Sequence, residues 1–185
     1  MWCIIKKIFE IRREIETMSK IYNVLDVSLY VAHHSAEKGT PISNLQLQKI
    51  LYYIQAMFLV NKGVECFNEE ILHWNYGPVI REAYDEFKVY GNGFIPKDVE
   101  YSKIIFDSKT NQIDFSKESL DDELFCLEDI VLMNVVIDAY RTKAPFELVN
   151  KTHQEDPWSK TQSNEIIPKQ KIEEYYKNNK ERILK

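Results

Sequence analysis

The chain is poor in glycine, proline and cysteine, and each shortage excludes some classes of fold or some kinds of site. Its 185 residues include five glycines and six prolines, which leaves few of the turns that barrels and sandwiches need and favours helices. The three cysteines, Cys3, Cys66 and Cys126, are an odd number, widely spaced and without a C-x-x-C pair. We therefore predict neither a disulfide framework nor a zinc site, and a reducing cytoplasm as the compartment.

Several functional signatures are also missing from the sequence. It contains no glycine-rich phosphate loop, no H-E-x-x-H and no G-x-S-x-G motif. Its net charge of −5 gives no electrostatic reason to expect binding to nucleic acid or to an anionic membrane, and suits a basic or aromatic protein surface better. We therefore predict that the protein is not an enzyme and has no catalytic residue, no metal site, no cofactor and no nucleic-acid partner.

Residues 1–17 are predicted to be an N-terminal extension, separate from one domain over residues 18–185. Charged residues interrupt this stretch too often for a membrane span, and it lacks the pattern of a signal peptide, so we expect no stable membrane association. Isoleucines at helical spacing favour an amphipathic helix. Three interpretations remain open: the extension docks on the chain's own body or a second copy, it lies on a membrane surface, or it is sequence upstream of a natural start at Met18.

Residues 43–90 are the best-defined part of the sequence. Ser43 followed by Gln46 forms a capping box, which predicts a helix that begins there and ends at Lys62-Gly63. Apolar residues at spacings of three and four predict a buried stripe made of Leu47, Ile50, Leu51, Ile54 and Phe58. The opposite face carries amides, an ammonium and phenols, groups that usually meet partners: Gln48, Lys49, Tyr52, Tyr53 and Gln55.

A rigid turn, WNYGP, follows at residues 74–78. Gly77 permits a backbone conformation closed to other residues, and Pro78 presets the first turn of a helix predicted over residues 79–90. The two large aromatic residues of the turn are therefore held in place. We interpret the turn as a fixed presentation of aromatic rings.

The second half of the chain adds a hairpin and more helices. Two strand-like runs, residues 101–106 and 112–115, flank the turn-rich DSKTN and predict a small antiparallel hairpin. Ser119 is the predicted cap of a helical run to Tyr140 that packs Leu120, Leu124 and Leu127 on one side, and shorter helices follow. The predicted fold class is mainly α, a single compact helical domain with a small antiparallel β-hairpin.

Three separated motifs occur in order: LQLQKILYY (residues 45–53), HWNYGPVIREAYDEF (residues 73–87) and THQEDPWSKT (residues 152–161). Together they resemble the Panacea antitoxin domain, the SocA-like group of bacterial and phage proteins, over about residues 22–176. The resemblance implies a mostly helical domain that neutralises a toxin encoded next to it by direct protein binding. One member looks like an adaptor that also delivers its toxin to a cytosolic protease. The chain departs from the pattern before Met18 and at Met57.

The predicted partner-binding or motif residues come from these three motifs: Gln48, Lys49, Tyr53, Trp74, Tyr76, Gly77, Pro78, His153 and Trp158. An alternative interpretation is that they form a buried network that fixes the packing of helix and turn. Two further hypotheses stay open for the function. One is a phage or mobile-element regulator that binds a host protein without a paired toxin; the other is a hydrolase or nuclease that uses His153 with Glu155 or Asp156.

Overall fold

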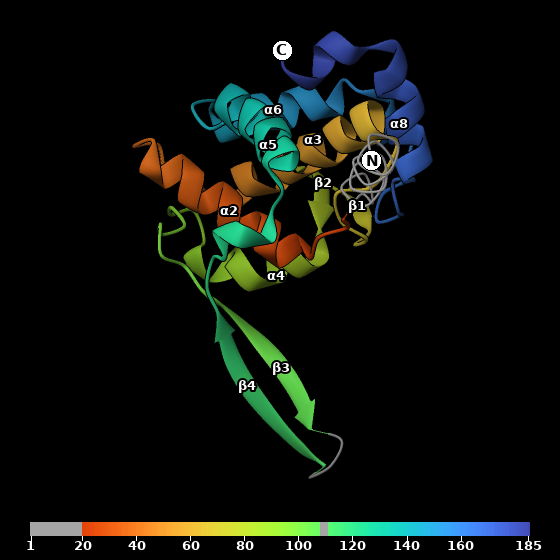
Figure 1. The fold of residues 1–185 in the computed structure, drawn as a ribbon. Coiled ribbons are helices and arrows are strands. Elements are labelled where there is room, and N and C mark those ends of the chain that lie inside the picture. Colours follow the sequence, from red (N-terminus) through yellow and green to blue (C-terminus); the bar gives the residue numbers. More distant parts are fainter. Residues whose placement is uncertain (1–19, 108–110) are drawn as a thin grey trace, which may run out of the picture.

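Helix α3 (Asn44–Lys62) runs through the centre of the molecule, with the other helices around it (Figure 1). The computed structural model describes residues 20–107 and 111–185, so the predicted extension of residues 1–17 and the start at Met18 lie outside the described residues. The Ser43 hydroxyl accepts a hydrogen bond from the Gln46 N–H and the Gln46 side chain accepts one from the Ser43 N–H, which confirms the capping box. Gly63 ends the helix with a φ of 69°.

The polar face of α3 is not at the surface, in contrast to the expectation from its residue types. Contacts with α2, α5, α6, α8 and strand β2 surround the helix. Its amide, ammonium and phenol side chains are consequently as buried as its apolar stripe. A helix buried all round has to hydrogen-bond its polar side chains inside the protein.

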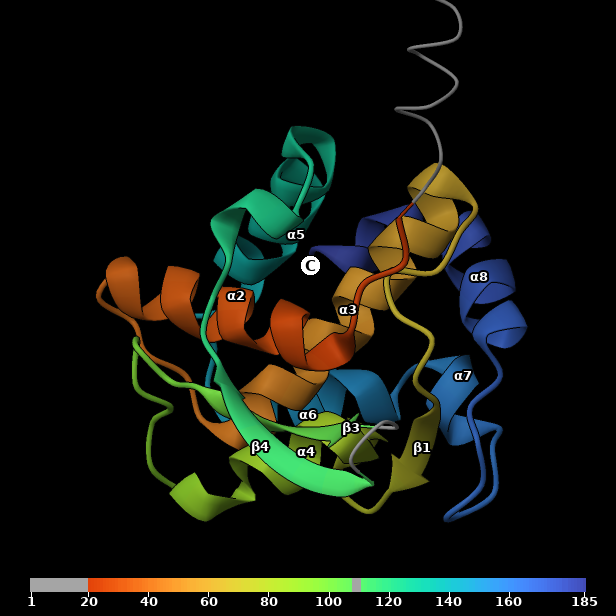
Figure 2. The same ribbon diagram turned by 60° about the horizontal axis from the view of Figure 1, so that its bottom comes forward.

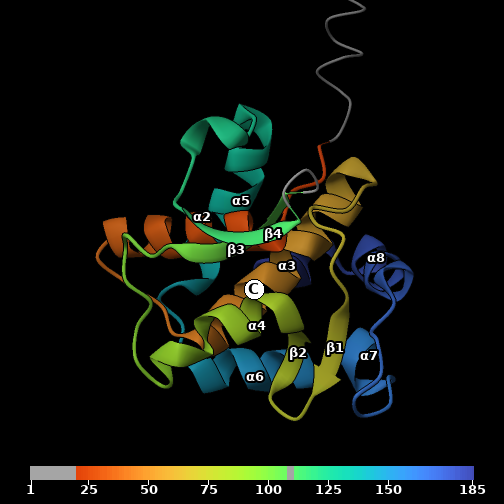
Figure 3. The ribbon, with the colours of Figure 1, turned by 90° about the horizontal axis from the view of Figure 1, so that it is seen from below.

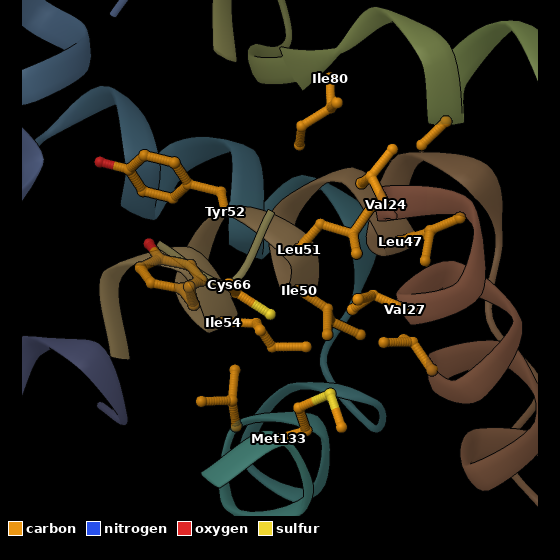
Figure 4. Close-up of a cluster of buried hydrophobic side chains, with 14 of the residues drawn as sticks. Val24, Val27, Leu47, Ile50, Leu51, Tyr52, Ile54, Cys66, Ile80 and Met133 are labelled. Carbon is orange, nitrogen blue, oxygen red and sulfur yellow. The ribbon is translucent and has the colours of Figure 1, made fainter. Parts of the chain in front are cut away.

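The main core lies where α3 meets α2 (Val24–Glu37) and α5 (Leu127–Tyr140). Figure 4 shows side chains from the three helices meeting there, among them Val24, Val27, Ile50, Ile54 and Met133. Asn23 caps α2 by accepting a hydrogen bond from the Leu25 N–H, as predicted. The fold is mainly α with two small two-stranded sheets, which confirms the predicted class.

The predicted helix over residues 79–90 is wrong at its start. Strand β1 (Ile71–Trp74) pairs with β2 (Gly77–Ile80) in an antiparallel hairpin, and α4 (Arg81–Phe87) begins only after it. A short 3₁₀ turn over Lys88–Tyr90 follows α4. Proline lacks an N–H and has a fixed φ, and these properties suit the edge of a strand as well as the start of a helix. Pro78 lies in strand β2.

The second hairpin is the one that the sequence predicts. Strand β3 (Tyr101–Asp107) pairs with β4 (Gln112–Glu118), and the two project from the helical body as an arm (Figure 1); Figure 2 turns the arm toward the viewer. The predicted helix start at Ser119 is wrong, because a 3₁₀ turn (Asp122–Leu124) precedes α5. Leu127 is consequently 82% exposed instead of packed.

The C-terminal segments close the body around α3. They are α6 (Pro145–His153), α7 (Asp156–Ser159), α8 (Lys169–Asn178) and a 3₁₀ turn (Lys180–Ile183). The connection between α7 and α8 covers the open edge of β1, where the His73 N–H donates to the Glu165 carbonyl at 2.9 Å. None of the helices in the described ranges is both long and apolar enough to cross a membrane.

Candidate functional site

Two neighbouring side chains of α3 form hydrogen bonds with backbone groups on the edge of strand β2 that does not pair with β1. The Ile80 N–H donates to Gln48 Oε1 at 2.9 Å, and Lys49 Nζ donates to the Pro78 carbonyl at 3.1 Å. The other edge of β2 pairs with β1. Backbone groups buried without a partner cost free energy, so these two bonds fix the hairpin on the helix.

Gly77 allows the turn of this hairpin to press against the body. Its φ is +98°, a conformation that side chains disfavour. A Cβ atom there would lie 2.6 Å from Lys49 Cε and 2.7 Å from Thr152 Oγ1. The glycine of the motif is therefore needed both for its backbone angle and for the close approach of α3 and α6.

The third motif holds the turn from its other side. Trp158 Nε1 donates to the Trp74 carbonyl at 3.2 Å. The rings of His73 and His153 both stack on the Trp158 indole, with centroids 4.1 and 3.8 Å away. Residues from three distant segments thus position one short turn.

The interior next to this turn carries basic groups without a counter-charge. Lys49 is fully buried, and burial lowers its pKa to about 7. Burial also lowers the pKa of His153, with smaller contributions from Lys49 and His73. No carboxylate in the described part of the chain forms an ion pair with Lys49, and among those residues no three His, Cys, Asp or Glu side chains are placed to hold a metal ion.

A second polar network adjoins the first one and includes Tyr53. The buried carboxylate of Glu155 accepts hydrogen bonds from Tyr53 at 3.0 Å, Tyr176 at 2.6 Å and Lys151 at 2.7 Å. The Tyr53 ring stacks on Tyr140 with centroids 4.5 Å apart. Tyr53 therefore ties α3 to α5, α6 and α8, and its bonds do not go to the turn.

The sequence reasoning missed Glu155 and Lys151 as members of a buried network. Their spacing of four residues, at the end of α6 and just beyond it, is a signal for an ion pair but does not reveal burial. The same network bears on the hydrolase hypothesis. Glu155 is engaged by two tyrosines and a lysine, and Asp156 pairs with Lys160 at 2.7 Å, so the structure assigns both carboxylates to partners other than His153.

A groove of about 860 Å³ lies beside the turn. It runs between the start of α3, the β1–β2 turn, α4 and the start of α6, whose arrangement is visible from below in Figure 3. Aromatic rings and amides dominate its lining: Trp74, Tyr76, Tyr84, Phe146, Asn44, Gln48, Asn75, Asn92 and Asn164. Lys88 is the one charged side chain among its lining residues in the described ranges. We refer to this surface as the aromatic groove.

The predicted site residues divide by exposure into two groups. Five are buried and hold the turn or the core: Gln48, Lys49, Tyr53, Gly77 and Pro78. Trp74, His153 and Trp158 are partly exposed, and Tyr76 is 60% exposed with its ring edge-on to Phe146 at 6.0 Å. Trp74 and Tyr76 line the aromatic groove, whereas Gln48 and Lys49 hydrogen-bond the strand that follows their turn.

Comparison with known proteins places this region in a known family. The model of the family described as Antitoxin SocA-like, Panacea domain, matches residues 47–159, more than half of the chain. Antitoxin SocA of Caulobacter vibrioides (strain NA1000 / CB15N) is 41% identical over 61 residues. That alignment covers 33% of this chain and 32% of the relative, so the chain spans about a third of the relative's length. No solved structure matches the chain.

Proposed function

On the premise that the chain belongs to the SocA-like antitoxin family with a Panacea domain, we propose that it is an antitoxin that neutralises a toxin protein by binding it directly. One observation supports this most strongly. The family region contains a turn whose buried residues hold exposed Tyr76 in a fixed position on the aromatic groove. A pre-positioned aromatic side chain loses little conformational entropy on binding, which is why such residues dominate many interfaces.

The chemistry of the groove suggests what kind of toxin surface it binds. Trp74, Tyr76, Tyr84 and Phe146 offer apolar area, and the amides of Asn75, Asn92 and Asn164 offer hydrogen bonds. The lining has one cation, Lys88, which Asp85 already pairs at 2.7 Å. We propose that the groove binds an apolar or aromatic segment with uncharged polar groups, while the net charge of −5 favours encounter with a basic toxin.

We propose that the complex forms in the cytoplasm and that the adjacent gene encodes the toxin. Its first test is co-expression of the chain with the neighbouring reading frame, scored for growth and for co-purification. The expected result is that the neighbouring gene alone arrests growth, that this chain restores growth, and that the two proteins purify together. A harmless neighbour, together with a complex between this chain and a host protein, would favour the regulator hypothesis instead.

A surface variant tests the proposed contact. Tyr76→Ala removes an exposed ring, so we expect the melting temperature to stay within about 2 °C while the affinity for the toxin falls about tenfold or more. Leu127→Ala is the matched control, because Leu127 is an exposed apolar residue on α5 outside the aromatic groove. Equal affinity of the wild type and Tyr76→Ala would refute the groove as the binding site.

Proteolytic delivery is a separate step of the proposal. If the chain acts as an adaptor, the half-life of the toxin in cells should shorten when this chain is present and recover when the cytosolic protease is removed. If neutralisation occurs by binding alone, the toxin remains at a constant level and growth is still restored. Measuring toxin abundance after a translation block separates the two mechanisms.

A further inference from the structure

The arm formed by β3 and β4 carries an apolar surface that the described part of the chain leaves open. Residues 102–106 and 111–115 are all exposed. The arm is attached at its base, where the Tyr101 hydroxyl donates to Asp26 of α2 at 2.8 Å. Figure 1 shows it projecting from the body as a separate ribbon.

The arm has two different faces. Residues paired across the strands share a face, and the register pairs Ile104 with Phe115 and Phe106 with Ile113. These four side chains are 58–69% exposed and form what we call the apolar face of the arm. On the opposite face Lys103 pairs with Ser116, and Ile105 with Asp114, so that face is mostly polar.

Such alternation is typical of a sheet with one face covered and one in water. A two-stranded hairpin is marginally stable alone and gains stability when its apolar face packs against something else. No described element of this chain packs on the apolar face, since each of its four residues is exposed. The face therefore needs a cover from outside the described body.

The size of the face argues against a second copy of this chain as the cover. Each strand of the arm has seven residues, and only the four side chains of the apolar face would lie between two arms packed face to face. Stable interfaces engage about 20–30 residues on each partner. Two arms packed face to face would therefore be too small to hold a dimer, and the partner must have a second contact on the body.

The aromatic groove supplies such a contact close to the arm. Tyr84 of α4 lines the groove, and so does Lys88, which follows the helix; α4 packs against α2, whose Asp26 accepts the hydrogen bond from Tyr101 at the arm's base. A connection of eight residues, 93–100, leads from Asn92 in the groove to the start of β3. The views of Figures 1 and 3 agree in placing α4 next to the base of the arm.

We propose that the apolar face of the arm binds the same toxin protein that occupies the aromatic groove, as a second and separate contact. This inference rests on the proposed function. The toxin surface that fits is an exposed apolar strip, such as one face of an amphipathic helix, laid across Ile104, Phe106, Ile113 and Phe115. Binding at both places buries more area than either contact alone and so moves the complex toward the size of a standard interface.

The test uses the full chain and the purified product of the neighbouring gene. Ile104→Thr with Phe115→Thr removes half of the apolar face and keeps residues that favour strands. Lys103→Thr with Ile105→Thr is the matched control on the opposite face. We expect the first pair to weaken toxin binding at least tenfold, the control pair to bind within twofold of the wild type, and both to melt within about 2 °C of it.

A third variant removes the arm altogether. Replacing residues 102–117 with Asn-Gly joins Tyr101 to Glu118, which are already paired across the arm's base. The body should fold as before, because residues 102–106 and 111–115 of the arm are all exposed and lie outside the buried core. Growth rescue should be lost.

Each remaining outcome is decisive. If the wild type binds the toxin and the armless chain binds it equally well, the arm inference fails and the proposed function stands. If the wild type does not bind the toxin, both fail. If sedimentation shows a dimer, and Ile104→Thr with Phe115→Thr converts it to a monomer, the apolar face binds a second copy of this chain. If removal of residues 1–17 makes toxin binding tighter, the apolar face binds that segment.

Discussion

Lys49 permits a quantitative test of the interior that supports the site. Its side chain is fully buried, its ammonium donates to the Pro78 carbonyl, and burial lowers its pKa to about 7. The unfolded chain would have the ordinary pKa of about 10.4. Lys49→Met removes the titration and keeps a side chain of similar length.

The sign of the effect follows from proton binding in the two states. Between pH 7 and pH 10 the unfolded chain holds a proton on Lys49 that the folded chain has mostly released, so the unfolding free energy rises with pH. From pH 7.5 to pH 9 this one group contributes an increase of about 2 kcal/mol, since each unit is worth about 1.4 kcal/mol. The lost hydrogen bond to Pro78 affects Lys49→Met equally at both pH values.

The assay is denaturant unfolding of the wild type and Lys49→Met at pH 7.5 and pH 9. Groups that titrate alike in both proteins cancel in the difference between them. The wild type should gain about 2 kcal/mol relative to the variant over this interval. Parallel pH profiles would refute the reasoning, because they would mean that Lys49 keeps its ordinary pKa and is not enclosed without a counter-charge.

Two matched pairs of variants test the positioning residues by the same unfolding assay. Glu155→Gln should lower the free energy of unfolding by about 3 kcal/mol, because it leaves the ammonium of Lys151 without its buried partner. Asp156→Asn breaks an exposed ion pair of the same 2.7 Å length and should lower it by less than about 1 kcal/mol. Equal costs would contradict the burial of that network. Gly77→Ala should lower the free energy of unfolding by about 3 kcal/mol, through backbone strain and steric clash. Gly39→Ala should lower it by about 1 kcal/mol, because φ is also positive there but nothing lies within 4 Å of the added Cβ. The reverse order would contradict the packed turn.

Local signals in the sequence predicted the elements that depend on local chemistry. The caps at Asn23 and Ser43, the helix end at Gly63 and the second hairpin are all confirmed, because each depends on side chains and backbone within a few residues. The start of α5 was predicted wrongly, since Ser119 and the apolar spacing after it allow a helix but the chain first makes a 3₁₀ turn.

The site was less predictable because its partners are distant in sequence. Gln48 and Lys49 look like a surface face of α3 until β2, about 30 residues later, brings its backbone to them. Pro78 likewise fits a helix start, and only the pairing of β1 with β2 decides for a strand. Motif resemblance identified these residues as a group, whereas their division into buried supports and an exposed Tyr76 required the structure.

The burial pattern gives the motif residues a physical role. Substituting Gln48, Lys49 or Gly77 is expected to weaken function through misplacement of the turn, with a fall in stability. Substituting Tyr76 is expected to weaken function with stability unchanged.

The most direct measurement of the central claim is amide hydrogen exchange of the chain alone and in complex with the neighbouring gene's product. The account predicts slower exchange on binding at the turn of residues 74–77, at the start of α6 and along the arm. Unchanged exchange in these segments, with protection confined to the C-terminal residues 180–185 or another distant surface, would contradict it.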